Sequence, residues 1–158
     1  MNGATHDPVL VDEVTELLRS VGGTIVDMTL GAGGHAEALL EAGVTRVLGV
    51  DRDPEAIELA AGRLARFGER FRVVHRRFSE VEEADVQGPV AGFLFDLGVS
   101  SMQLDQPERG FGYRIDGPLD MRMAGASEDD TPTAGELVNT LDEGRLADLL
   151  YQYGEERR

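Results

Sequence analysis

The sequence predicts an α/β fold built on a doubly wound parallel sheet. Apolar runs of strand length alternate with segments of helical periodicity through the first two-thirds of the 158 residues, and a glycine-rich turn follows the first of these runs. Nearly continuous apolar runs are typical of strands that are covered on both faces, and strands that alternate with helices form right-handed βαβ units. The alternation therefore indicates one sheet with helices packed on it.

The helix starts and the apolar runs place each element. Two caps with proline in the first helical position, Asp7-Pro8 and Asp53-Pro54, begin predicted helices, and an S-x-x-E capping box at Ser79–Glu82 begins a short one. The predicted order is helix 8–21, strand 24–29, helix 36–42, strand 46–51, helix 54–67, strand 71–75, the short helix from Ser79 and strand 90–97.

The sequence changes character after Gly98. Residues 100–135 are rich in Gly, Pro, Asp and Arg without periodicity, which predicts a long ordered loop of the kind that is usually functional. Capping boxes at Thr133–Glu136 and Thr140–Glu143 then predict helix starts. Because four strands make only half a sheet, the sequence is expected to be a fragment of a longer protein.

Composition limits the class of protein. Apolar residues make up 41% of the chain, which is typical of a globular protein, and the absence of cysteine excludes a disulfide scaffold and a thiol nucleophile. No run approaches the roughly 20 apolar residues of a membrane span, so we expect a cytoplasmic protein without a membrane partner. The His, Asp and Glu residues have no metal-ligand spacing, so no metal is predicted.

The charge argues against a polyanionic partner. There are 30 acidic residues against 15 basic ones, all of them arginine, and the net charge is −15. One segment differs, since residues 63–77 contain six arginines and one acid, Glu69. The simpler interpretation of this cluster is a solvated helix face and strand end, and an RNA contact is the alternative.

The turn Gly31-x-Gly33-Gly34 predicts a site for a nucleoside-containing cofactor. Glycines let the backbone approach a ligand, and the following helix offers unpaired N–H groups. Asp51 ends the next strand twenty residues after Gly31, where its carboxylate can accept the hydroxyls of a ribose. Asp27 and Asp96, at the carboxyl ends of other strands, suit the positive charge of S-adenosylmethionine better than the pyrophosphate of NAD, but both cofactors stay open.

Longer motifs give a more specific indication. The chain resembles the bacterial 16S rRNA cytosine-N4 methyltransferases, the ribosomal RNA small subunit methyltransferase H family. The segments that carry the resemblance are His6-x-Pro8-Val9-Leu10, Asp27-x-Thr29-x-Gly31-x-Gly33-Gly34-His35, Asp51-Arg52-Asp53-Pro54, Asp96-Leu97-Gly98-Val99-Ser100-Ser101-x-Gln103-Leu104-Asp105, Arg109-Gly110-Phe111, Asp116-Gly117-Pro118-Leu119-Asp120-Met121-Arg122-Met123 and Tyr153-Gly154-Glu155-Glu156-Arg157.

The resemblance implies a fold and a set of cofactor contacts. The fold would be a class I S-adenosylmethionine methyltransferase sheet, with residues 1–106 as its N-terminal part and 107–158 as the start of an inserted helical substrate-recognition domain. The implied cofactor contacts are Gly33, Gly34 and His35 at the methionine part, Asp51 at the ribose, Phe78 and Asp96 at the adenine side, and Gln103 completing the pocket. From the residues alone, His35 is as well explained as a helix-start residue, and Phe78 is better explained as a core residue.

The implied reaction is methylation of the exocyclic N4 of a cytidine in 16S ribosomal RNA of the small ribosomal subunit. The base must leave its stack, which Phe111 or Tyr113 can support by stacking. Asp96 or the backbone of 97–101 is placed to receive the proton, but no residue compels a catalytic assignment, and the oligomeric state is not specified. A truncated chain that binds cofactor without activity and an NAD-dependent oxidoreductase are the alternatives.

Overall fold

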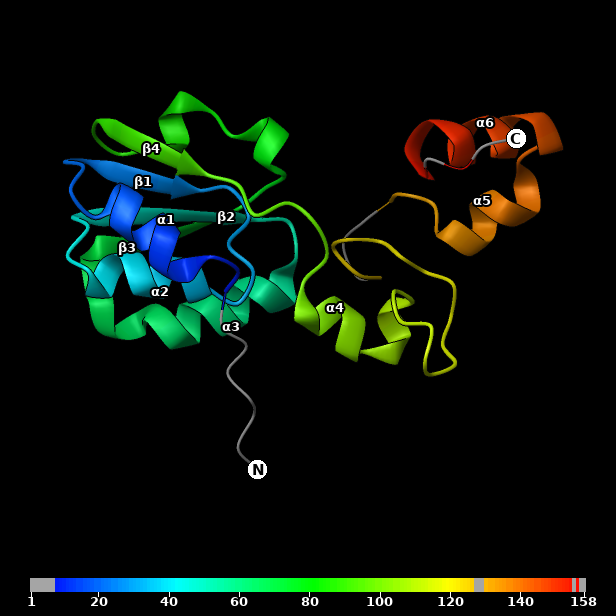
Figure 1. Ribbon diagram of the computed structural model, residues 1–158, viewed down its shortest axis with the longest axis horizontal. Helices are drawn as coiled ribbons and strands as arrows, with labels where there is room; N and C mark the ends of the chain where they lie inside the picture. Colours follow the sequence, from blue (N-terminus) through cyan, green and yellow to red (C-terminus); the bar gives the residue numbers. More distant parts are fainter. Residues whose placement is uncertain (1–7, 127–129, 155, 157–158) are drawn as a thin grey trace. The chain divides into compact units, whose positions relative to one another are not determined.

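Four parallel strands form the sheet of the N-terminal unit (Figure 1). They are β1 (Thr24–Asp27), β2 (Arg46–Asp51), β3 (Phe71–His75) and β4 (Val90–Leu94). Their order in the sheet is β3-β2-β1-β4. The chain therefore places β2 and β3 on one side of β1 and β4 on the other side. The carboxyl ends of β1 and β4 therefore flank the crevice where open α/β sheets bind ligands. The parallel sheet with helices confirms the predicted α/β class.

The computed structural model describes residues 8–126, 130–154 and 156. The chain forms two compact units, Met1–Gly98 and Val99–Arg158. The boundary between them follows Gly98, and the assignment of 1–106 and 107–158 to a methyltransferase part and an inserted domain stays a prediction. No helix in the described part of the chain is long and apolar enough to span a membrane.

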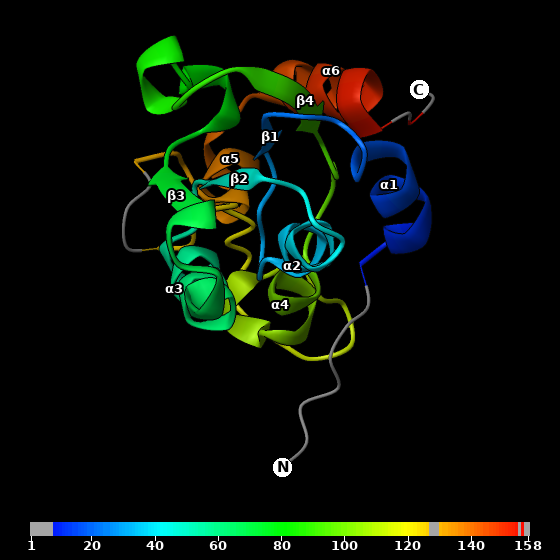
Figure 2. The same ribbon diagram turned by 90° about the vertical axis from the view of Figure 1, so that its left-hand side faces the viewer.

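The two faces of the sheet are covered differently. Helices α1 (Val11–Leu18), α2 (Gly34–Glu41) and α3 (Pro54–Leu64) belong to one face, whose buried cluster contains Ile25, Leu39 and Leu64. Val26, the neighbour of Ile25 in β1, points to the opposite face and packs with Leu48 and Val50. That face is covered by the segment between β3 and β4, which contains the short 3-10 turns η2 (Phe78–Glu80) and η3 (Glu83–Asp85) (Figure 2).

The predicted start of the first helix was wrong. Asp7 lies outside the described residues, and the helix begins at Val11, after a turn in which Leu10 has a φ of 53°. Pro8 lies so close to the glycine loop that a Cβ on Gly34 would be 2.4 Å from its Cγ. This tertiary contact places Pro8 on the loop and outside the helix.

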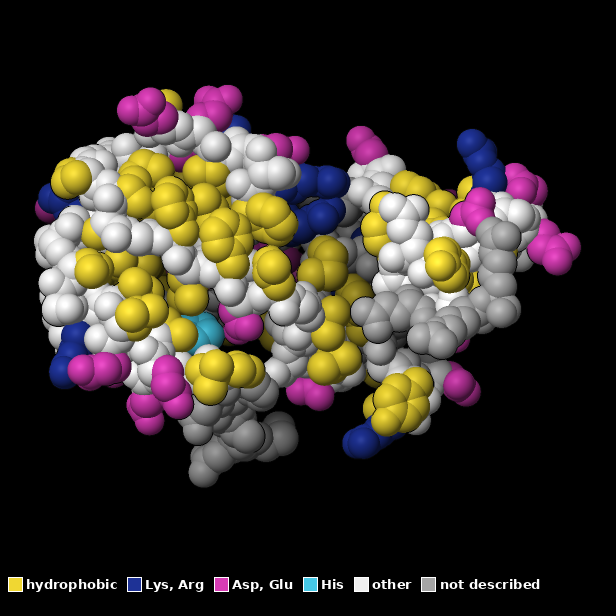
Figure 3. Space-filling model, turned by 45° about the horizontal axis from the view of Figure 1, so that its top comes forward, with side chains coloured by type: hydrophobic (Ala, Val, Ile, Leu, Met, Phe, Trp, Pro, Cys, Tyr) yellow, Lys and Arg dark blue, Asp and Glu magenta, His cyan; other side chains and the backbone are white. Residues whose placement is uncertain are grey.

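The fourth strand is shorter and more exposed than predicted. It ends at Leu94, and among the described strands it pairs only with β1, at the edge of the sheet. Val90 and Phe93 are 41% and 55% exposed, so the expectation of a strand covered on both faces was wrong. Hydrophobic side chains gather on the face of the first unit that carries β4 (Figure 3), and Phe95 and Leu97 continue the exposed apolar run.

Two of the predicted capping boxes were also wrong. Instead of a helix capped by Ser79, the chain makes η2 after Arg77 and η3 after Glu82. Helix α6 (Glu143–Gly154) follows Asp142, whose carboxylate accepts the N–H of Arg145 at 3.0 Å. Thr140 instead ends α5 (Ala134–Thr140), and the predicted box of Thr133 and Glu136 at the start of α5 is confirmed.

The second unit contains a helix within the predicted loop. Helix α4 (Ser101–Asp105) begins at a capping box of Ser100 and Gln103, and the 3-10 turn η4 (Pro107–Arg109) follows it.

Further along, the Arg122 guanidinium donates two hydrogen bonds to the Asp120 carboxylate, at 2.9 and 2.7 Å. This pair lowers the pKa of Asp120. The motif 116–123 therefore has a structural role inside this unit.

Packing against β2 gives a first test. A Cβ on Gly49 would lie 2.6 Å from a methyl carbon of Leu30, a core residue that begins the glycine loop. We expect Gly49→Ala to lower the free energy of unfolding by about 1–3 kcal/mol because the side chain overpacks the core. Urea unfolding measures the change.

Gly62 is the matched control, since it lies in α3 with nothing within 4 Å of an added Cβ. Gly62→Ala should raise the free energy of unfolding by roughly 0.5–1 kcal/mol through helix propensity. Equal effects of the two substitutions would contradict the packing argument.

Candidate cofactor-binding site

The glycine loop connects β1 to α2 and packs closely on α3. Leu30 N donates to Val50 O at 3.0 Å, and Gly33 N donates to Leu30 O at 2.9 Å. Gly33 has a φ of 82°, and a Cβ there would lie 3.0 Å from Leu64 and 3.2 Å from Ala60. The left-handed backbone and the contact with α3 both require glycine.

Asp51 connects the end of β2 to this loop. Its Oδ2 accepts the N–H of Gly31 at 2.8 Å, and its Oδ1 accepts the N–H of Asp53 at 2.9 Å. Two backbone donors therefore fix the carboxylate in place. Each carboxylate oxygen has a further lone-pair site, so the half-buried group retains capacity to accept hydroxyl donors.

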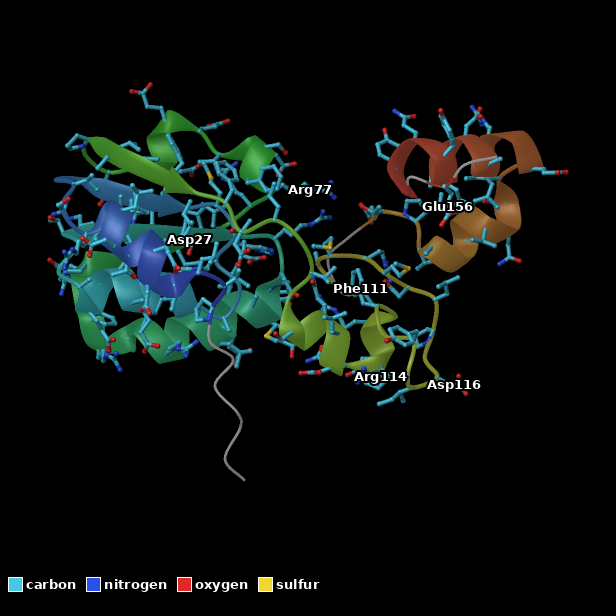
Figure 4. All side chains as sticks on the ribbon, viewed as in Figure 1. Asp27, Arg77, Phe111, Arg114, Asp116 and Glu156 are labelled. Carbon is cyan, nitrogen blue, oxygen red and sulfur yellow. The ribbon has the colours of Figure 1, made fainter. Side chains whose placement is uncertain are left out.

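Asp27 is the most deeply buried carboxyl of the site, with 1% of its surface exposed. Its Oδ1 accepts the N–H of Thr29 at 3.2 Å, whereas its Oδ2 has no hydrogen-bond partner in the described residues. Burial raises the pKa of Asp27 from 3.8 to about 6, and Asp51 and Asp96 add to the increase, while the Thr29 N–H and His35 oppose it. Figure 4 shows Asp27 within the first unit.

His35 lies in the first turn of α2 and bridges two other segments. Its Nε2 is 2.9 Å from Val9 O, and its Nδ1 is 3.9 Å from Asp96 Oδ2. A carbonyl oxygen only accepts, so Nε2 carries the proton in this contact. Asp96 is positioned from its other side, because its N–H donates to Thr29 Oγ1 at 2.7 Å. The ring of His35 therefore connects the segment before α1 to Asp96.

Phe78 and Phe95 form an exposed aromatic pair beyond the ends of β3 and β4. Their ring centroids are 5.9 Å apart with an interplanar angle of 87°. Phe78 is 50% exposed and Phe95 is 48% exposed, so Phe78 is not a core residue. The exposed ring surface offers a flat apolar contact to a ligand.

Gln103 belongs to the second unit, where it is buried. Its Oε1 accepts the N–H of Ser100 at 2.8 Å, and its Nε2 donates to Met123 O at 3.0 Å. These bonds hold α4 to the loop before α5. The cofactor role that the resemblance implies for Gln103 stays a prediction.

The arginine cluster supports the simpler of its two interpretations. Arg63 Nε pairs with Glu37 Oε2 at 2.7 Å, and Arg76 Nε pairs with Asp85 Oδ2 at 3.2 Å. Arg70 donates to the carbonyls of Leu40 and Val44 at the end of α2. Arg66 pairs with Glu37 and Glu41. Four of the six arginines therefore act within the fold.

Within the first unit, the sequence-predicted residues meet at one edge of the sheet. The carboxyl ends of β1, β2 and β4 are surrounded by five of these residues and lie next to Asp27. The five are Gly33, Gly34, His35, Asp51 and Asp96. Sequence reasoning missed Thr29, whose hydroxyl holds Asp96, and Phe95, which packs on Phe78. Thr29 belongs to the Asp27-x-Thr29-x-Gly31 motif, and this motif is the only sequence signal that could have identified it.

The parallel sheet, its glycine loop and the acids at its edge define a Rossmann-like α/β protein. A family profile described as "MraW methylase family" matches residues 3–158. The chain belongs to this family.

Curated relatives agree with this assignment. The chain is 51% identical over 152 residues to a ribosomal RNA small subunit methyltransferase H of Cereibacter sphaeroides. The aligned residues cover 96% of this chain and 44% of the relative. A protein of the same name from Nocardioides is 50% identical, over 99% of this chain and 51% of its own length. The chain thus spans about half the length of the curated relatives it matches.

Solved structures overlap with smaller parts of the chain. An rRNA methylase from Streptococcus thermophilus is 23% identical, with 61% of this chain and 58% of that chain covered and a TM-score of 0.47.

The raised pKa of Asp27 gives a test of the site without a ligand. Because the folded-state pKa lies above the ordinary value, ionisation of Asp27 costs the folded state more than the unfolded state. The contribution of Asp27 to the free energy of unfolding is therefore highest below about pH 4, where Asp27 is neutral in both states. This stabilisation is lost as the pH rises through about 6 and the folded-state carboxyl ionises. Relative to Asp27→Asn, the wild type should lose on the order of 3 kcal/mol of unfolding free energy between about pH 4 and pH 7.

Chemical denaturation at several pH values measures this difference. Glu58→Gln is the control because Glu58 is exposed on α3, and its stability curve should run parallel to that of the wild type. A parallel curve for Asp27→Asn would contradict the assignment of a buried, costly carboxyl.

Proposed function

We propose that this chain is part of an S-adenosylmethionine-dependent methyltransferase that methylates the N4 of a cytidine in 16S ribosomal RNA of the small subunit. Membership of the MraW methylase family supports methyl transfer, and the names of the relatives supply the ribosomal RNA substrate. Ribosomal RNA as substrate is consistent with the expected cytoplasmic location.

The observation that carries the cofactor assignment is the unpaired Oδ2 of Asp27. A buried carboxylate oxygen without a donor costs the folded protein free energy, which a ligand with a cationic N–H group would recover. S-adenosylmethionine brings an ammonium and a sulfonium. By contrast, the pyrophosphate of NAD would meet the carboxylates of Asp27 and Asp96, which disfavours the oxidoreductase alternative.

The other site residues fit the remaining parts of the cofactor. Gly33, Gly34 and His35 are assigned to the methionine part, and Asp51, held by the N–H groups of Gly31 and Asp53, to the ribose hydroxyls. Phe78 and Asp96 are assigned to the adenine side, where Phe78 presents half of its surface. Gln103 keeps the cofactor role that the resemblance implies, in addition to its bonds within the second unit.

S-adenosylmethionine supplies an electrophilic methyl group when bound. Transfer of this methyl group to N4, with S-adenosylhomocysteine as the leaving group, would require N4 to lose a proton. The protein must hold N4 in line with the methyl group, about 3–3.5 Å away, and accept the proton. Asp96 is the candidate acceptor in the first unit because its side chain is 46% exposed, its Oδ2 lies 3.9 Å from His35 Nδ1, and its backbone N–H is held by Thr29 Oγ1.

One alternative rests on a specific observation. Since the chain spans about half the length of its relatives, it is also consistent with a part that binds cofactor without completing the transfer. Incubation of the 158-residue chain with small ribosomal subunits and methyl-labelled S-adenosylmethionine separates the two functions. Incorporation of label into RNA supports the enzyme, and cofactor binding without incorporation supports the alternative.

Cofactor binding is tested by thermal unfolding. S-adenosylhomocysteine at about 100 times its dissociation constant should stabilise the chain by about 2.7 kcal/mol and raise Tm by roughly 5–10 °C. Asp51→Ala should abolish this rise because the ribose loses its acceptor. NADH should give no rise.

Asp53→Ala is the matched control. Asp53 caps α3 by accepting the N–H of Glu55 at 3.1 Å, so its loss should cost about 1 kcal/mol of stability and leave the ligand-induced rise intact. If the wild type shows no rise with S-adenosylhomocysteine, the proposed cofactor is wrong.

A further inference from the structure

The loop of residues 111–116 in the second unit is closed by two backbone contacts. Gly110 has a φ of 75°, and a Cβ on it would lie 2.4 Å from Pro118 O. A Cβ on Gly117 would lie 2.1 Å from Pro107 O. Met121 N also donates to Arg109 O at 3.0 Å. The two ends of the loop are thus packed backbone against backbone, which fixes the base of the loop.

The tip of this loop exposes an aromatic ring beside a cation. Tyr113 is 91% exposed, and the guanidinium carbon of Arg114 is 5.9 Å from the centroid of its ring. Ile115, which follows, is 63% exposed. Figure 4 shows Arg114 and Asp116 at the outer edge of the second unit. The Tyr113 ring is exposed to solvent, and the two ends of the loop that carries it are fixed by backbone packing. The ring is therefore accessible to a partner.

Arg114 also differs from the arginines of the first unit. Arg63, Arg66 and Arg76 pair with carboxylates. In the part of the chain that the structure describes, no ion pair involves Arg114, and its contact is with Tyr113. In a chain with a net charge of −15, it is a cation directed to solvent next to a stacking surface.

We propose that Tyr113 and Arg114 form a contact for single-stranded RNA, in which the ring stacks on a base and the guanidinium binds the adjacent phosphate. Proteins bind single strands by combining exposed aromatic rings, on which bases stack, with arginines that contact the backbone. The proposal rests on the proposed function, which supplies RNA as the substrate. It gives the acidic chain a local means of binding a polyanion.

The test measures binding of a fluorescently labelled single-stranded RNA of about ten nucleotides, with a central cytidine, by anisotropy at several salt concentrations. Tyr113→Ala should weaken binding at least about fivefold because base stacking is lost. Tyr113→Phe keeps the ring and should stay within about twofold of the wild type. Arg114→Gln should weaken binding and reduce the slope of log affinity against log salt by about 0.7, whereas Arg114→Lys should retain that slope.

Tyr151→Ala is the matched control, since Tyr151 is 58% exposed on α6 and should leave RNA binding unchanged. Each variant is also heated with and without S-adenosylhomocysteine. Failure of the proposed function appears as an absent Tm rise in the wild type. The RNA contact is overturned if a chain with the normal Tm rise binds no RNA, binds it equally well after Tyr113→Ala, or is weakened to the same degree by Tyr151→Ala.

Discussion

The hydrogen bond from Gly31 N to the Asp51 carboxylate is the interaction on which the site depends. It joins the loop after β1 to the end of β2, which are adjacent in the sheet but twenty residues apart in the chain. The ladder between β1 and β2 brings Leu30 N to Val50 O, and the missing side chain of Gly49 leaves space for Leu30. Once the loop is held there, Gly33 reaches α3 and α2 begins at Gly34.

The same arrangement explains why the acids cluster. Parallel strands end at one edge, so residues that terminate β1 and β2 and follow β4 meet there whatever their separation in sequence. Burial is the main cost for Asp27, whose pKa rises to about 6, and the nearby carboxylates of Asp51 and Asp96 add to it. Fold stability alone gives no reason to keep this cost. The proposed cationic ligand would give one, because the three carboxylates would attract it and it would supply the donor that Asp27 Oδ2 lacks.

Sequence reasoning predicted the elements whose signals are local. The strands 46–51 and 71–75 were predicted with their observed bounds because each is an apolar run next to a helix or turn signal. Asp51 was identified because its spacing from Gly31 reflects one βαβ unit. The start of α1 was wrong because the position of Pro8 is decided by Gly34, which lies 26 residues further along the chain. The predicted burial of β4 was wrong because burial depends on which segments lie beside the strand. An apolar run of strand length does not encode those neighbours.

The contacts that the sequence did not indicate are between distant segments. Thr29 and Asp96 are 67 residues apart, and Phe78 meets Phe95 only because β3 and β4 end at the same edge of the sheet. The arginine cluster shows the same limit. Residues 63–77 look basic along the chain, yet Glu37, Glu41 and Asp85 neutralise much of the cluster in the fold. Net charge and local charge runs are therefore poor guides to where this chain would bind a polyanion, and what matters is which cations the fold leaves without a carboxylate.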